Sequence, residues 1–171
     1  MVEDGGLPVT ATLRRTDPFH PGTCRFQDPN CIVETGKDCA QTGCIYEITC
    51  SSCQEAVAQD KTKDSRQTGT QEGHNYIGMT MSSVHSRMKD HLKGQRAKSN
   101  SNPLWRHDQE YHEGEPQRYK TRILNREQRL LPLSVLEGLY IEAQRDGTSM
   151  NEKNERGRGG LVRLVATRGL T

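Results

Sequence analysis

The chain has 171 residues, of which 31% are hydrophobic and 5% aromatic, and its 24 Lys and Arg nearly balance 22 Asp and Glu. This polar composition excludes a large apolar core, so part of the chain must be loop or be stabilised by something other than burial. No apolar run is long enough to cross a bilayer, and residues 1–4 do not begin a secretory signal. We therefore expect an intracellular protein with no membrane partner.

The charge is unevenly distributed along the chain. Residues 1–72 carry 7 Lys and Arg against 11 Asp and Glu, whereas residues 73–171 carry 17 against 11. A modestly basic half is compatible with a polyanion partner. In a chain without a secretory signal, the six cysteines indicate metal ligation more than disulfides.

The first half of the chain predicts two strands separated by a loop. Residues 1–23 are rich in Gly and Pro and indicate a flexible lead-in, and residues 24–43 indicate a cysteine-rich, loop-rich knuckle. The β-branched and aromatic run from Cys44 to Cys50 predicts a strand. A polar loop is expected from Gln54 to Gly73, followed by a second short strand from His74 to Thr80.

The second half predicts three helices and one strand. Ser82–Gly94 has a serine cap, apolar residues four apart and a terminal glycine, and therefore predicts a helix. A second helix is expected over Ser101–His112, which begins with Asn-Pro, and a strand over Gln117–Leu124. Leu131–Gly147 predicts the main core helix. Its apolar residues at helical spacing are Leu133, Leu136, and Leu139 or Tyr140. This order predicts a small α+β domain with a three-stranded, mostly antiparallel sheet.

Two tripeptides in the expected strands carry a family resemblance. Cys44-Ile45-Tyr46 and Tyr76-Ile77-Gly78 resemble the two halves of the GIY-YIG nuclease signature. The resemblance is most specific to the endonuclease domain of Penelope-like retroelements, because further elements of that domain follow in the same order. These elements are Cys50 and Cys53, Arg87 and His91, Leu104 with His107 and His112, Glu137, and Asn151-Glu152-Lys153-Asn154-Glu155. The ordered match spans residues 24–163.

The resemblance implies a GIY-YIG-like domain over residues 44–163, with the polar insertion at 54–73 and a tail at 164–171. It implies a nuclear, divalent-metal-dependent DNA endonuclease of retroelement origin that nicks one strand by hydrolysis. It also implies a reverse transcriptase as a companion in a longer form of the protein.

The chemistry of phosphodiester cleavage assigns roles to these residues. Arg87 and His91 are four apart and project from one helix face, where the guanidinium can bind the scissile phosphate and the imidazole can shuttle a proton. Tyr46 and Tyr76 on paired strands can orient water and phosphate, and Glu137 can bind Mg²⁺ or Mn²⁺. The resemblance implies that Glu137 is the sole ligand of that metal and that Tyr46 is the base or water-positioning residue. It also places Asn151 in the catalytic set.

Each of these residues has an ordinary structural explanation when taken alone. A strand tyrosine usually packs in a core, and Arg87 and His91 can be the solvated face of a helix. Glu137 lies among leucines, and Glu142 is a competing carboxylate. The ordered set favours the nuclease. Two departures bear on activity: Cys44 replaces the first glycine, and the turn before Glu137 lacks basic residues.

The cysteines predict one closed metal site. Cys50-x-x-Cys53 and His107-x₄-His112 have the spacings of a Cys₂His₂ zinc site. The resemblance implies the same four ligands and a structural role for the ion. The alternative is a thioredoxin-like redox dithiol, which would open a helix after its strand; a polar loop after Cys53 does not fit that alternative.

The upstream cysteines are candidates for a second zinc site. Its candidate ligands are Cys24, Cys31, Cys39 and Cys44, with His20 as an alternative to Cys44, which stands in the place of a glycine. These four cysteines could also be free thiols in a linker.

Basic residues after the first helix are expected to contact DNA phosphates, which position a protein without specifying sequence. They are Lys93, Arg96, Lys98 and Arg106. Three functions remain open from the sequence: a DNA endonuclease, a zinc-stabilised nucleic-acid-binding module with an inactive nuclease site, and a thiol redox protein.

Overall fold

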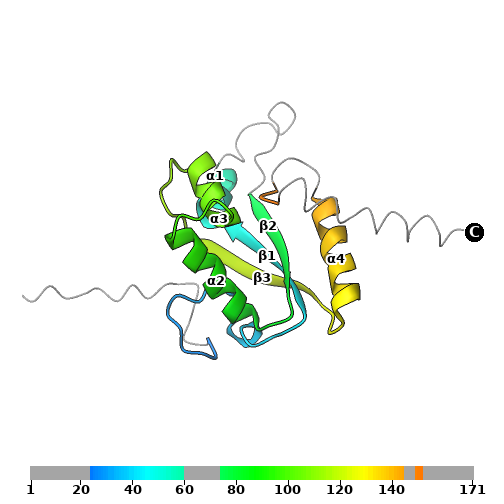
Figure 1. Ribbon diagram of the computed structural model, residues 1–171. Coiled ribbons are helices and arrows are strands. Elements are labelled where there is room, and N and C mark those ends of the chain that lie inside the picture. The colour runs from blue at the N-terminus through cyan, green and yellow to red at the C-terminus, as the bar shows by residue number, and fades with distance from the viewer. Residues whose placement is uncertain (1–23, 60–73, 145–148, 152–171) are drawn as a thin grey trace, which may run out of the picture.

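The computed structural model describes residues 24–59, 74–144 and 149–151, with the backbone alone at 57–59. The predicted lead-in at 1–23, most of the insertion at 54–73 and the tail at 164–171 lie outside the described residues. The elements are η1 (Gly36–Asp38), β1 (Cys44–Cys50), α1 (Ser51–Gln59), β2 (Asn75–Thr80), α2 (Val84–Arg96), α3 (Pro103–Tyr111), β3 (Tyr119–Arg126) and α4 (Leu130–Ala143) (Figure 1).

The sheet confirms the predicted α+β class. Its strand order is β2-β1-β3, and both pairings are antiparallel. The central strand β1 is buried at every position except Thr49. Such continuous burial requires cover on both faces of the sheet.

Helices supply this cover from both sides, as Figure 1 shows with α2 and α4 on opposite sides of the sheet. Because side chains alternate along a strand, Tyr46 and Ile48 share one face and pack with Met88 of α2 in the larger core cluster. Ile45 points the other way and packs with Leu133 of α4 in a smaller cluster.

The predicted loop from Gln54 is wrong for residues 54–59, because α1 begins at Ser51 directly after β1. Gln, Glu and Ala are good helix formers, but the described part of this helix is mostly exposed from Gln54 to Ala56. A helix with little apolar surface has no apolar period, and its polarity alone suggested a loop.

The sequence predicted that Gly94 ends this helix, but α2 continues to Arg96. A Cβ at Gly94 would lie 2.4 Å from Asn102 Nδ2, so this glycine lets the start of α3 approach α2. Asn102 caps α3: its side-chain oxygen accepts hydrogen bonds from the Leu104 and Trp105 amides, and its Nδ2 donates to the His91 carbonyl oxygen.

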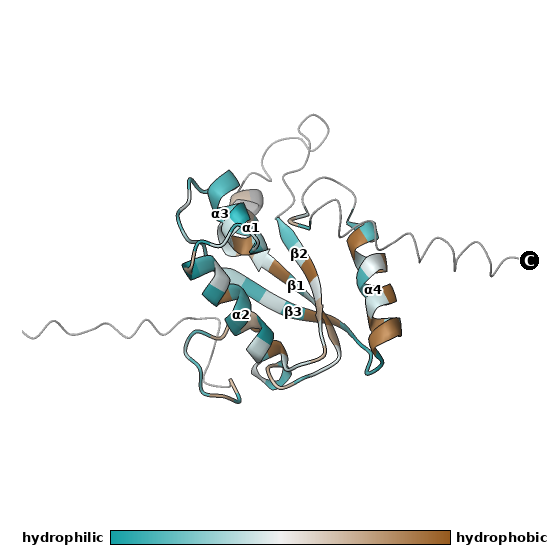
Figure 2. Ribbon diagram, in the orientation of Figure 1, coloured by the Kyte–Doolittle hydropathy of each residue, from teal (hydrophilic) through white to brown (hydrophobic). Residues whose placement is uncertain are grey.

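The expectation that α4 is the main core helix is wrong. Only Leu133, Gly138 and Ile141 are buried on it, and Leu139 is 45% exposed. Figure 2 shows hydrophobic colour on both faces of α4, the one toward the sheet and the one away from it. The larger core forms instead between the sheet and the helices α2 and α3. Within the described residues, no helix has the length and apolar character needed to span a bilayer.

Candidate functional site

Three predicted site residues meet in one hydrogen-bonded group between β1 and α2. The Arg87 Nε donates to the Tyr46 hydroxyl oxygen over 3.1 Å, and the same hydroxyl lies 2.9 Å from His91 Nε2. Arg87 and His91 are one helical turn apart on α2, so both reach the same atom of β1. The Tyr76 ring lies 5.4 Å from the His91 ring and completes the group from β2.

The glycine of the Tyr76-Ile77-Gly78 tripeptide makes room for this group. Gly78 pairs with Tyr46 across the β1–β2 ladder. A Cβ at position 78 would lie 2.5 Å from the Tyr46 hydroxyl oxygen and 2.9 Å from a Tyr76 ring carbon. Any side chain here would therefore push the tyrosine away from its partners.

The electrostatics of the group favour a neutral imidazole beside a charged guanidinium. Burial, together with the positive charge of Arg87, lowers the pKa of His91 to about 4. Burial opposes the charge of Arg87, but its contact with Tyr46 and the nearby Tyr76 and Asp90 raise its pKa overall. At neutral pH His91 can therefore accept a proton while Arg87 holds a positive charge.

A pocket of about 540 Å³ opens beside this group. Tyr76, Arg87 and His91 line it, together with Arg106 and residues of the connection between α2 and α3. A space of this size accommodates a nucleotide. Tyr46 is fully buried and does not line the pocket, but its hydrogen-bond partners Arg87 and His91 do.

Two further predicted residues lie on the other side of β2. Glu137 is partly buried on α4, one turn after Leu133 and one turn before Ile141, and so shares the helix face that packs on the sheet. It does not line the pocket beside Arg87. Asn151 is buried, and its side chain pairs with the backbone of Ile77: Nδ2 donates to the carbonyl over 2.7 Å, and Oδ1 accepts from the amide over 2.9 Å.

The predicted phosphate-binding residues have different surroundings. Lys93 and Arg96 are exposed in the last turn of α2, where basic residues also favour the helix dipole. Lys98 places its Nζ 5.2 Å from the centre of the Trp105 ring. Of these four residues, Arg106 is the one that lines the pocket beside Arg87.

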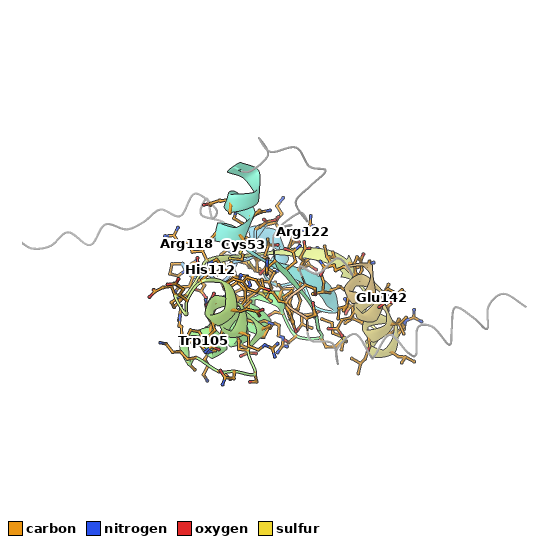
Figure 3. All side chains as sticks on the ribbon, turned by 90° about the horizontal axis from the view of Figure 1, so that it is seen from above. Cys53, Trp105, His112, Arg118, Arg122 and Glu142 are labelled. Atoms are coloured by element: carbon orange, nitrogen blue, oxygen red, sulfur yellow. The ribbon has the colours of Figure 1, made fainter. Side chains whose placement is uncertain are left out.

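Four other predicted ligands converge at the end of β1 remote from Tyr46. Cys50 Sγ lies 3.5 Å from His112 Nε2, and Cys53 Sγ lies 3.4 Å from His107 Nε2 and 3.3 Å from His112 Nε2. The two imidazole nitrogens are 3.2 Å apart. Figure 3 shows Cys53 and His112 together, with Glu142 of α4 at the other side of the molecule.

These spacings match a tetrahedral zinc site. With Zn–S of about 2.3 Å and Zn–N of about 2.05 Å, tetrahedral angles separate a sulfur from a nitrogen by about 3.5 Å and two nitrogens by about 3.3 Å. The four groups can therefore hold a metal ion such as zinc, with no coordination position left open. An ion here would join β1 and α1 to α3.

The protonation states of the ligands fit metal binding that releases protons. Burial, with a contribution from His74 and His112, lowers the pKa of His107 to about 3, so its ring is neutral. Burial and the neighbouring Cys50 raise the pKa of Cys53 to about 12. The thiol is thus protonated without metal and must lose its proton to become a ligand.

Cys53 lies in the first turn of α1, so the polar loop expected after the CxxC is wrong, and the dithiol does open a helix after a strand. Redox chemistry is disfavoured instead by the two histidine nitrogens beside the sulfurs, which sequence spacing suggested and the fold brings to contact distance.

A buried polar network that the sequence did not indicate supports the helix carrying His107. Asp108 is fully buried and accepts hydrogen bonds from the Tyr119 hydroxyl over 2.6 Å and from Gln95 Nε2 over 2.7 Å. A single Asp among polar residues of a short helix gives no periodic signal. Its importance follows only from the approach of α2 and β3.

A second unpredicted group lies on the α4 side of the sheet. Glu47 is 5% exposed, forms an ion pair with Arg122, and accepts hydrogen bonds from the Asn75 and Gln144 side chains. It lines a smaller pocket of about 220 Å³. The sequence alone placed Glu47 in a strand without a role.

The upstream cysteines divide into three that gather and one that does not. Cys24, Cys31 and Cys39 bring their sulfurs together. Cys44 is buried in β1 and its thiol donates to the Thr42 carbonyl oxygen instead. His20, the alternative ligand, lies outside the described residues.

Comparison of the chain with protein-family models, curated proteins and solved structures finds no match. The chemistry must therefore be argued from the two sites themselves. One presents a neutral imidazole, a buried phenol and a guanidinium at a nucleotide-sized pocket. The other presents two thiols and two imidazoles at metal-binding distances.

Proposed function

We propose that this chain is a GIY-YIG-type endonuclease of retroelement origin that nicks DNA by hydrolysis at the pocket beside Arg87. The observation that carries this proposal is the meeting of Arg87, Tyr46 and His91 around one hydroxyl oxygen. A guanidinium at the wall of a nucleotide-sized pocket suits a phosphate, and a neutral histidine next to it suits proton transfer.

In the proposed reaction, water attacks the phosphorus, the bond to the leaving sugar oxygen breaks, and that oxygen takes up a proton from solvent to leave as a hydroxyl. Arg87 binds a non-bridging oxygen and stabilises the negative charge that develops in the transition state. His91, neutral at pH 7, takes a proton from the attacking water, and its hydrogen bond with Tyr46 holds the ring in place. Tyr76 shapes the pocket wall next to the reacting phosphate.

Glu137 is the proposed ligand of Mg²⁺ or Mn²⁺. It lies on the sheet-facing side of α4, across the edge strand β2 from the pocket beside Arg87, which it does not line. Mg²⁺ keeps most of its water shell, so one carboxylate suffices to hold it. When bound, such an ion supplies a bound water of lowered pKa and charge stabilisation for the phosphate.

Zinc at Cys50, Cys53, His107 and His112 is proposed to be structural. A site with four protein ligands has no open position for a substrate. Its contribution is to fix the end of β1 against α3, because metal binding energy in such a site is folding energy.

The proposal is tested by nicking of supercoiled plasmid with zinc-loaded protein in Mg²⁺ or Mn²⁺. Loss of one charge-stabilising donor costs about 10²- to 10³-fold in rate, so we expect a loss of that size for Arg87→Gln. Arg118→Gln is the matched control, since Arg118 is exposed at the other end of the sheet. It should keep the parent rate.

A second pair of variants tests the metal ligand. Glu137→Gln removes the carboxylate and should abolish nicking, whereas Glu142→Gln, on the same helix, should not. If Glu142→Gln abolishes nicking and Glu137→Gln does not, the ligand is misassigned. If the folded parent binds DNA with a salt-dependent affinity but gives no nicks in either ion, the protein is a binding module and the nuclease proposal fails.

A further inference from the structure

The loop-rich segment before β1 gathers three sulfur atoms. Cys31 Sγ lies 3.3 Å from Cys39 Sγ, and Cys39 Sγ lies 3.7 Å from Cys24 Sγ. In a tetrahedral site with Zn–S of about 2.3 Å, two sulfurs are about 3.8 Å apart. The cluster is therefore close to the spacing that three thiolates adopt around one metal ion.

The three cysteines do not belong to the other Cys/His site. They come from the segment 24–39, which η1 and two turns fold on itself, whereas Cys50 ends β1 and Cys53 lies in the first turn of α1. Cys31 is 7% exposed and Cys39 is fully buried.

The segment also holds the first turn of α2. The amides of Val84 and His85 need partners at a helix start, and they donate to the carbonyl oxygens of Gln41 and Cys39 over 2.9 Å each. On the adjoining surface, the His85 ring contacts Asp28 through a 2.9 Å hydrogen bond and stacks on Phe26.

On its other side the segment joins the sheet. Val33 forms a parallel bridge with Thr121 of β3. The Glu34 amide donates to the Thr121 carbonyl oxygen, and the Thr121 amide donates to the Ile32 carbonyl oxygen. The three cysteines therefore lie in a segment that connects the outer edge of β3 to the start of α2.

We propose that Cys24, Cys31 and Cys39 bind a second zinc ion, and that this ion fixes the N-terminal turn of α2. The soft thiolates select a thiophilic ion, and three of them leave one tetrahedral position for a water or another donor. Because Cys39 is at once a ligand and the acceptor for the His85 amide, the ion restrains the helix that carries Arg87 and His91.

The metal content of the full chain, purified under reducing conditions with zinc, tests this proposal without reference to nuclease activity. We expect two zinc ions per chain for the parent and one for Cys31→Ser. Cys44→Ser is the matched control. That buried thiol donates only to a backbone carbonyl oxygen, which a serine hydroxyl can also do, so this variant should retain two.

A second measurement keeps the proposal open to refutation if Cys31→Ser does not fold. The parent loaded with ¹¹³Cd should give two NMR resonances, and the one from three thiolates should be the more deshielded. One resonance, or one zinc per chain in the parent, would overturn the proposal. So would a Cys31–Cys39 disulfide found by mass spectrometry in the reduced preparation.

Amide hydrogen exchange tests the restraint on α2. In Cys31→Ser we expect faster exchange at Val84 and His85 than in the parent, with α3 unchanged. Equal exchange in the first turn of α2, in a variant that has lost one zinc, would show that the ion does not fix this helix.

Discussion

A methyl group at Gly78 is the smallest change that should disrupt the Arg87–Tyr46–His91 group. The added Cβ would lie 2.5 Å from the Tyr46 hydroxyl oxygen and 2.7 Å from the ring carbon that carries it. Optimal separation between such atoms is about 3.5 Å, so the ring must move by about 1 Å. Tyr46 is fully buried, and its neighbours leave little room for that movement.

The cost can be estimated from two destabilising contributions and one that opposes them. Overpacking of a well-packed core costs about 1–3 kcal/mol. Weakening the hydrogen bonds of Tyr46 to Arg87 and His91 adds about 0.5–1.5 kcal/mol each. Replacement of glycine by alanine also stabilises a strand by about 0.4–1 kcal/mol through the unfolded state. We therefore expect Gly78→Ala to lower the free energy of unfolding by about 2–4 kcal/mol.

Urea denaturation of zinc-loaded protein measures this cost, with the fluorescence of Trp105, the single tryptophan, as the probe. A double-mutant cycle with Tyr46→Phe identifies the cause. Without the hydroxyl, the ring loses its nearest contact with Cβ and is free of its two hydrogen bonds, so Gly78→Ala should cost about 1 kcal/mol less in that background. An unchanged stability for Gly78→Ala, or the same cost in both backgrounds, would refute the reasoning.

Three further predictions concern pH, the sheet edge and the metal. The pKa of His91 is about 4 in the folded protein against 6.5 when exposed. The contribution of His91 to the free energy of unfolding is therefore fully present above pH 6.5 and falls by about 3 kcal/mol as the pH drops from 6.5 through 4. Stability measured against pH should fall less for His91→Gln than for the parent, and parallel profiles would contradict this. Asn151→Ala leaves the Ile77 amide and carbonyl without their side-chain partner and should cost about 2–3 kcal/mol in urea denaturation; a cost below about 0.5 kcal/mol would exclude a role in securing β2. Chelation of zinc should unfold the chain by circular dichroism, since structural zinc supplies about 10–16 kcal/mol in small domains and total stability is about 5–15; a chelator-treated protein with an unchanged thermal transition would exclude a structural metal.

The main secondary structure could be predicted because its signals are local. β-Branched and aromatic residues from Cys44 to Cys50 specify a strand, and the structure places β1 on those residues. Caps and apolar spacing likewise specified α2 and α3 to within two residues. The local signals failed for α1, whose polar sequence has no apolar period, and for the end of α2, where the deciding contact comes from a later part of the chain. Gly94 reads as a helix stop until Asn102 is seen to pack against it.

The metal ligands could also be proposed from spacing, because each pair is close in sequence. Spacing did not decide whether the two pairs meet. Cys53 and His107 are 54 positions apart in the sequence, yet their side chains lie 3.4 Å apart in the fold. The upstream cysteines show the same limit. Four cysteines were candidates, with Cys44 the doubtful one. The fold brings the other three together, whereas Cys44 is fixed in β1 with its thiol toward the Thr42 carbonyl oxygen.

By itself, the sequence determined the residue types, their order and the local elements that carry them: two tyrosines on strands, Arg87 and His91 on one helix face, and cysteine and histidine pairs at ligand spacing. Only the tertiary structure decided which of these groups touch. Alternation along β1 directs Tyr46 toward α2, and the antiparallel register sets Gly78 opposite it. The packing of α2 on that face then brings a guanidinium and a neutral imidazole to one hydroxyl. Such contacts depend on register and packing between segments far apart in the chain, and no local pattern encodes them.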